Sequence, residues 1–142
     1  MPGINTVIVD TDALVGLIHT DDTLHVRCLA VARYLEKNNF ATVVPGPIVL
    51  EAATVLSKDK TIKRPDLAKR LLQDYAQLIP PSLDIQVFPQ LAQAYDPLSS
   101  RKNTPFDFYV LTAAKAQNIP IVFSFDSFYK KNGLTLAEEL LH

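Results

Sequence analysis

TVIVD, residues 6–10, is the stretch that decides the fold, because a run of β-branched residues ends there in an acid. Such a run is typical of a buried strand, and we predict one from Ile4 to Val9. A second apolar run, from Ile119 to Phe125, ends in the same way at Asp126. The sequence therefore predicts two strands that each carry an acidic side chain, Asp10 or Asp126, at the carboxyl end.

The rest of the chain alternates between helical and strand patterns. These patterns predict helices over residues 11–19, 47–57, 90–95, 105–117 and 135–141. They predict two further helices, one between a cap at 20–22 and a stop at 38–39, the other from residue 65 to a stop at 80–81. Strands are predicted over 4–9, 41–44, 83–88 and 119–125. Strands that alternate with helices need crossover connections, which produce a parallel sheet with helices on both faces. We therefore predict one α/β domain over residues 1–142.

Two further acids face the core side of predicted helices. Glu51 shares a helix face with Ile48 and Val55. Asp107 shares its face with Leu111 and lies near the start of its helix, where backbone N–H groups favour an anion. Because a buried carboxylate is costly unless a cation or hydrogen bonds neutralise it, both positions indicate a special environment.

Together the four acids predict one site beyond the carboxyl ends of the strands, where functional groups gather in such sheets. Carboxylate oxygens suit Mg²⁺ or Mn²⁺, and the chain has no thiolate cluster or histidine set of the kind that binds zinc. Simpler explanations stay open. Asp10, Asp107 and Asp126 could each cap a helix, and Glu51 could be exposed on a helix that is apolar nearly all round.

Composition favours a globular protein that acts on a polyanion. The chain has 142 residues, of which 48% are hydrophobic and 20% charged, and one cysteine, Cys28. It has no membrane-spanning apolar run and no basic segment before its first strand, so we expect a cytoplasmic protein without a membrane partner. The net charge of −1 includes the acids of the site, while basic residues cluster at 58–64, 101–102 and 130–131. An acidic cleft with basic surroundings is what a metal-dependent enzyme acting on a polyanion needs.

Three segments in order, TVIVDTDALV (6–15), PGPIVLEAATVL (45–56) and PFDFYVLTAAKAQNIPIVFSFD (105–126), resemble the PIN-domain family. These are small metal-dependent ribonucleases that include the VapC-type toxins. The resemblance implies a three-layer α/β/α sandwich with a parallel central sheet of four or five strands. It also implies frequent homodimers, Mg²⁺ or Mn²⁺ as the cofactor and, for a toxin, an antitoxin partner.

The resemblance assigns the residues of the site. Asp10 would be the central metal ligand, Asp107 and Asp126 would complete the shell, and Glu51 would bind a second metal or orient the attacking water. The supporting candidates are Thr11, Asp12 and Ser124, the last at a place where the family often has Ser or Thr. Two departures stand out: Asp12 replaces the usual Asn, and residues 127–131 offer no further acid. We expect an endoribonuclease that hydrolyses phosphodiester bonds.

Two other functions remain open at this point. A strand followed by Asp10-Thr11-Asp12 is also how haloacid-dehalogenase-like phosphatases begin, with Asp10 as the covalent nucleophile. That function needs a late pair of acids, whereas only Asp126 precedes Glu138 after the last predicted strand. The other alternative is a module with this fold that binds RNA without cleaving it. Binding without metal-dependent turnover would support the latter.

Overall fold

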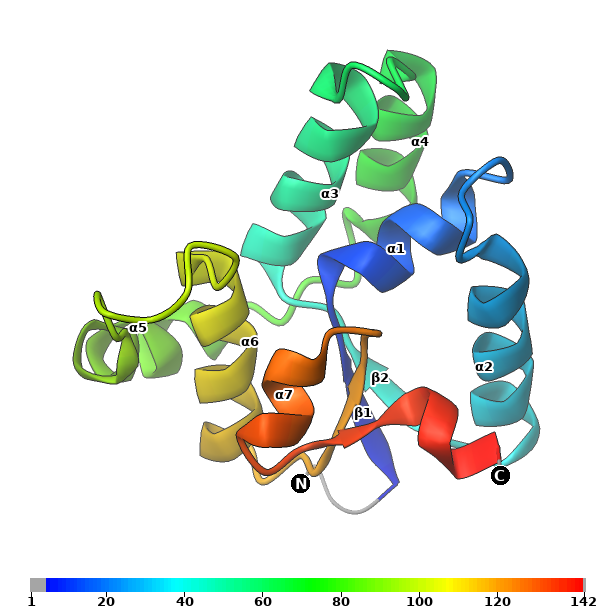
Figure 1. Ribbon diagram of the computed structural model, residues 1–142. Helices are drawn as coiled ribbons and strands as arrows, with labels where there is room; N and C mark the ends of the chain where they lie inside the picture. The colour runs from blue at the N-terminus through cyan, green and yellow to red at the C-terminus, as the bar shows by residue number, and fades with distance from the viewer. Residues whose placement is uncertain (1–4, 142) are drawn as a thin grey trace.

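The computed structural model describes residues 5–141 (Figure 1). Its elements in order are β1 (Thr6–Val9), α1 (Thr11–Ile18), α2 (His25–Lys37), β2 (Ala41–Val43), α3 (Gly46–Lys58), α4 (Pro65–Tyr75), α5 (Leu83–Ala94), α6 (Pro105–Ala116), β3 (Ile121–Phe123), α7 (Ser127–Lys131), β4 (Thr135–Leu136) and the 3-10 helix η1 (Ala137–Leu141). The strands form a four-stranded parallel sheet in the order β2-β1-β3-β4. β1 is central, and its Ile8 pairs with Val43 of β2 and Val122 of β3.

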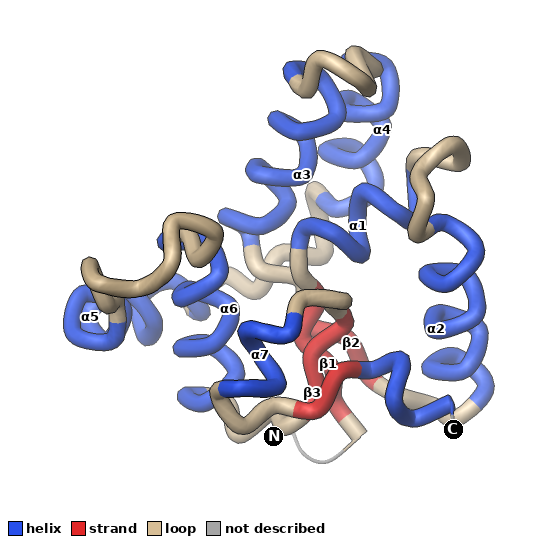
Figure 2. The backbone as a smooth tube through the Cα atoms, viewed as in Figure 1, coloured by secondary structure: helices blue, strands red, loops and turns tan. Residues whose placement is uncertain are grey.

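Helices cover both faces of this sheet, as parallel crossovers require. α2 lies on one side, while α6 and α7 lie on the other, and Figure 2 shows the strands between these two layers. The predicted three-layer α/β/α sandwich is therefore confirmed. α3 and α4 pack against each other as a pair that projects beyond the carboxyl ends of the strands (Figure 1).

Two elements, β1 and α6, contribute long runs of consecutive buried residues to the core. Every residue of β1 is buried, and so is the run from Phe108 to Ala114 in α6. A strand at the centre of a parallel sheet has no solvent-facing side, so it reads as a continuous apolar run rather than an alternating one. Among the described residues, no helix combines the length and apolarity that crossing a membrane requires.

The predicted strand over 83–88 is wrong, because these residues open helix α5 and absorb the short helix predicted over 90–95. Leu83, Ile85 and Val87 alternate with polar residues, which suggested a strand. In the helix, Leu83 and Val87 lie one turn apart and are buried, whereas Ile85 is 78% exposed. The contact of α5 with α6 selects the helical period over the strand period.

The carboxyl-terminal helix predicted over 135–141 also needs correction. Thr135 and Leu136 pair with β3 as strand β4, and the segment that follows is a 3-10 helix. The strand predicted over 119–125 is shorter, as β3 covers only Ile121–Phe123. The sheet therefore has four strands, but the fourth is β4 rather than residues 83–88. Ile4, the predicted first residue of the first strand, lies outside the described residues.

Candidate active site

All four acids predicted from the sequence line one cavity beyond the carboxyl end of the sheet. Asp10 follows β1, Glu51 comes from α3, Asp107 from α6 and Asp126 from the end of the β3 segment. The cavity has a volume of about 360 Å³, and Asp12 lines it as well. Residues that are distant in the sequence therefore meet because α3 and α6 both begin near the edge where β1 and β3 end (Figure 1).

Asp10 is the most buried of these acids, with 5% of its surface exposed. Its Oδ1 accepts a hydrogen bond of 2.8 Å from the backbone N–H of Thr11. Its Oδ2 accepts one of 2.8 Å from the phenol of Tyr129 and a longer one of 3.4 Å from the hydroxyl of Ser124. Burial and the nearby charge of Asp12 nevertheless raise the pKa of Asp10 to about 8.

Asp12 joins helix α1 to the segment that follows β3. Its Oδ2 accepts hydrogen bonds from the hydroxyl of Ser124 at 3.0 Å and from the backbone N–H of Phe125 at 2.8 Å. Its Oδ1 accepts from the backbone N–H of Ala13 at 2.9 Å. These contacts hold the first turn of α1 and the end of the β3 segment together beneath the cavity. Burial is the main cause that raises the pKa of Asp12.

Glu51 and Asp107 are half-buried and each accepts a hydrogen bond from a threonine. The hydroxyl of Thr11 donates to Oε1 of Glu51. The backbone N–H of Thr104 donates to Oδ2 of Asp107 at 2.8 Å, within a capping box at the start of α6. Burial raises the pKa of both carboxyls, and the charge of Asp107 adds to the effect on Glu51.

Helix capping and a shared site turn out to be compatible explanations. Asp10 caps α1, Asp107 belongs to the capping box of α6, and Asp126 caps α7 by accepting from the N–H of Phe128 at 2.9 Å. All three capped ends border the same cavity. Backbone N–H groups at these ends favour anions, which lowers the cost of gathering several carboxylates in one place.

Lys102 lines this cavity, but no basic side chain in the described part of the chain forms an ion pair with its acids. Within residues 5–141, the ion pairs formed by lysine and arginine involve other acids. In the same part of the chain, no three His, Cys, Asp or Glu side chains converge closely enough to form a ready coordination shell. The hard oxygen donors fit a divalent cation such as Mg²⁺ or Mn²⁺, which would offset the mutual repulsion of the acids. The carboxylates would have to turn from their present hydrogen-bond partners toward the ion.

Tyr129 is a residue of this site that sequence analysis missed. It is fully buried, and its phenol reaches Asp10 from helix α7. An aromatic residue next to two lysines indicates core packing or base stacking, so its sequence context gives no signal of this contact. Asp22 also lines the cavity, and its carboxylate accepts from the backbone N–H of Leu24 at 2.8 Å.

Comparison with known proteins bears on the family and the fold of the chain. The model of the PIN domain family matches residues 7–133. A search of curated protein sequences gave no significant match. Among solved structures, the chain is similar to the crystal structure of Mycobacterium tuberculosis VapC20, described as a toxin that cleaves the sarcin–ricin loop. The two are 15% identical, with a TM-score of 0.63, and the match covers 91% of this chain and 96% of that chain.

Proposed function

This chain belongs to the PIN domain family, and from that premise we propose that it is a metal-dependent endoribonuclease. The observation that carries the proposal is the convergence of Asp10, Glu51, Asp107 and Asp126 on one cavity from four separate parts of the chain. We propose that these carboxylates hold Mg²⁺ or Mn²⁺. Because the chain belongs to this family, we prefer this function to the phosphatase alternative, in which Asp10 would act as a covalent nucleophile.

Each carboxylate has a distinct task in this proposal. Asp10 lies deepest, between the ends of β1 and α7, and serves as the central ligand. Asp107, in α6, and Asp126, the residue that caps α7, complete the shell. Thr11 holds Glu51, which places that carboxylate to orient a water molecule or to hold a second ion. When bound, a divalent ion supplies charge stabilisation for the phosphodiester and a more acidic water.

The supporting residues act on the shape of the site. Asp12 and Ser124 bond to each other across the gap between α1 and the segment after β3. The single hydroxyl proton of Ser124 is shared with Oδ2 of Asp10, at the longer distance of 3.4 Å, so Ser124 contacts both the central ligand and Asp12. We propose that these bonds keep Asp10 and Asp126 at the separation that a shared ion needs. A metal site loses affinity for its ion when the residues that orient its ligands are removed.

We also propose that the substrate is RNA and that the protein is the toxin of a toxin–antitoxin pair, acting in the cytoplasm as a homodimer. The similarity in fold to VapC20, a toxin that cleaves an RNA loop, supports the RNA substrate and the toxin role. The toxin role can be tested genetically. A neighbouring gene for a small antitoxin should suppress the growth arrest that this chain causes, and growth unaffected by expression of the chain would argue for RNA processing instead.

The proposed activity is tested by cleavage of structured RNAs in the presence of Mg²⁺ or Mn²⁺. Asp10→Asn should abolish cleavage, because it removes the central carboxylate without changing the size of the side chain. Asp21→Asn is the matched control, since Asp21 is exposed and lies outside the cavity. Activity that survives in Asp10→Asn, or in excess chelator, would refute the assignment. RNA binding without turnover in the wild-type protein would support a non-catalytic RNA-binding module.

A further inference from the structure

A second cavity adjoins the acidic one and shares two of its residues, Lys102 and Asp126. Its volume is about 550 Å³. The walls come from the loop between α5 and α6 and from helix α7; the residues are Ala94, Asp96, Ser99, Ser100, Lys102, Asn103, Phe108, Asp126, Ser127, Phe128, Lys131 and Asn132. A molecule that lies across both cavities therefore passes directly from the acids to this loop.

The second cavity has an apolar floor and polar walls. Phe108 and Phe128 are buried, with ring centroids 5.2 Å apart in an edge-to-face contact. Around them stand serine hydroxyls and asparagine amides, of which the amide of Asn103 donates to the hydroxyl of Ser99 at 2.8 Å. An apolar surface edged by short hydrogen-bonding groups suits a base and its sugar, which carry one flat face and several polar edges.

The lysines of this cavity are available to an anion. Lys102 and Lys131 are exposed, and neither forms an ion pair with another residue in the described part of the chain. Lys130, the neighbour of Lys131, instead pairs with Glu139 at 2.9 Å and lies outside the cavity. Asp96 opposes this charge, although its carboxylate already accepts from the backbone N–H of Leu98 at 2.9 Å.

We propose that this cavity binds the nucleotide of a single-stranded RNA that adjoins the phosphodiester held at the acids. The inference rests on the proposed function and extends it to how the substrate lies. Lys102, at the junction of the two cavities, contacts the phosphate between them, and Lys131 contacts the next phosphate along the strand. The base occupies the space above Phe108 and Phe128. Residues of the 96–104 loop then contribute to sequence preference.

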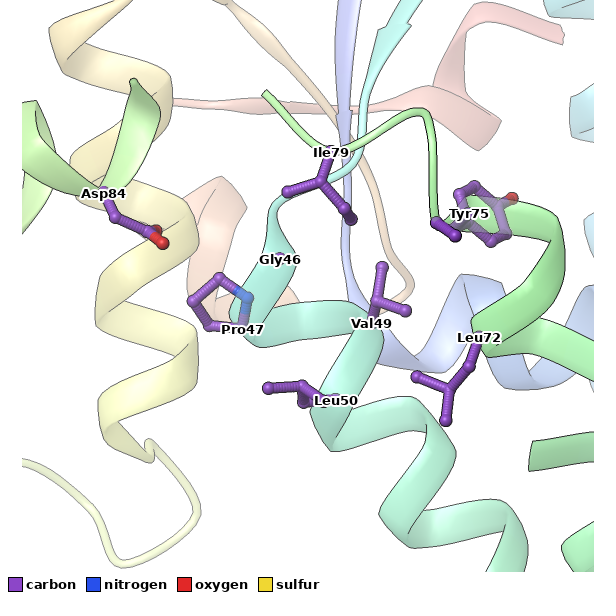
Figure 3. Close-up of a pocket in the computed structure, with 9 residues that line it drawn as sticks. Gly46, Pro47, Val49, Leu50, Leu72, Tyr75, Ile79 and Asp84 are labelled. Atoms are coloured by element: carbon purple, nitrogen blue, oxygen red, sulfur yellow. The ribbon is translucent and has the colours of Figure 1, made fainter. Parts of the chain in front are cut away.

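The cavity between α3 and α4 does not suit the same ligand (Figure 3). Its walls are mainly apolar, with Val49, Leu50, Leu72 and Ile79 directed toward the space. Asp84 is its charged residue among those described, and a single carboxylate repels a phosphate. The positive charge that an RNA backbone requires therefore lies in the cavity that adjoins the acids, and not in the cavity between α3 and α4.

Binding of RNA to a variant that does not cleave tests this proposal. In the Asp10→Asn background with Mg²⁺, the probe is a labelled single-stranded RNA pool of roughly ten nucleotides, a length within the range of single-strand sites. Lys131→Gln should weaken binding about fivefold and reduce the slope of log K against log salt by about 0.7, as expected for one lost phosphate contact. Lys130→Gln removes the same charge from the same helix and should leave binding within about twofold of the parent.

The outcomes separate this proposal from the proposed function. If the wild-type protein cleaves RNA but Lys131→Gln and Lys130→Gln bind the probe equally, the nucleotide site is wrong and the nuclease stands. If Lys131→Gln selectively weakens binding while the wild-type protein shows no metal-dependent cleavage, the nucleotide site stands and the catalytic assignment falls. A parent that does not bind the probe at all overturns the nucleotide site as well. In the cleaving protein, Lys131→Gln should raise KM with little change in kcat.

Discussion

Tyr129 donates a hydrogen bond of 2.8 Å to Oδ2 of Asp10, and both side chains are buried. The bond ties helix α7 to the end of β1, so two elements far apart in the sequence position one carboxylate. Asp10 thereby has a donor on each oxygen, because the N–H of Thr11 serves the other. Tyr129 is therefore a positioning residue for the acid at the centre of the cavity.

Tyr129→Phe should lower both stability and metal affinity. It leaves Oδ2 of Asp10 with only the 3.4 Å bond from Ser124. A buried acceptor that loses its main donor costs about 1–3 kcal/mol in the free energy of unfolding. Loss of a partner that orients a metal ligand should weaken Mn²⁺ binding by about tenfold. Denaturant titration in chelator measures the first effect, and calorimetric titration with Mn²⁺ measures the second.

Tyr109→Phe provides a matched control for this prediction. Tyr109 is also buried, and its phenol donates to an aspartate, Asp84, that lies outside the acidic cavity. Its loss should reduce stability but leave Mn²⁺ affinity unchanged. Equal effects of the two substitutions on Mn²⁺ affinity would show that Tyr129 acts only through stability.

The stability of the metal-free protein should fall as the pH rises. Burial raises the pKa of Asp10 from 3.8 to about 8, so the folded state keeps a proton that the unfolded state releases. The stabilisation is complete below the unfolded pKa and is lost as the pH passes the folded value. Between about pH 5 and about pH 8 the loss should be on the order of 3 kcal/mol, since one pKa unit corresponds to about 1.4 kcal/mol. Denaturant titrations in chelator across this range measure it.

Asp10→Asn should flatten this pH dependence, because the amide does not titrate. Asp21→Asn, at an exposed position, should retain the slope of the parent protein. A slope of the same size in Asp10→Asn would assign the effect to another group, such as Asp12, whose pKa burial also raises.

The positions of the four acids could be predicted from two kinds of information: the local pattern of apolar residues around each acid, and the rule that functional groups gather beyond the carboxyl ends of parallel strands. Asp10 and Asp126 follow apolar runs, and parallel strands bring their carboxyl ends to the same edge. Glu51 and Asp107 could be placed from helical spacing alone. The fold followed from the same alternation of strands and helices.

Other features depend on contacts that no local pattern carries. The segment from Leu83 to Val87 fits both a strand and a helix, and only packing against α6 decides between them. The contact of Tyr129 with Asp10 depends on how α7 is turned, and the two residues are 119 positions apart. The bond from Phe125 to Asp12 is of the same kind, because it requires α1 and β3 to be in their final places.

Asp107→Asn should raise the melting temperature of the metal-free protein and reduce the increase that Mg²⁺ or Mn²⁺ produces. Burial makes the charged form of Asp107 unfavourable, and its pKa is raised accordingly. Asparagine keeps an oxygen that can accept from the N–H of Thr104, so the capping box at the start of α6 survives in part. Thermal melts with and without Mn²⁺ measure both effects. A metal-induced increase equal to that of the wild-type protein would remove Asp107 from the ligands.

Thr11→Val should reduce cleavage about tenfold while changing the free energy of unfolding by less than about 1 kcal/mol. Valine has the shape of threonine but lacks the hydroxyl that donates to Glu51, so the carboxylate loses its fixed orientation. Thr11→Ser restores the donor and should recover most of the activity. Thr54→Val is the control, since the hydroxyl of Thr54 donates to the carbonyl of Leu50 on the exposed side of α3. If Thr11→Ser is as impaired as Thr11→Val, the methyl group of Thr11 is what matters, and Glu51 is not oriented by the hydroxyl.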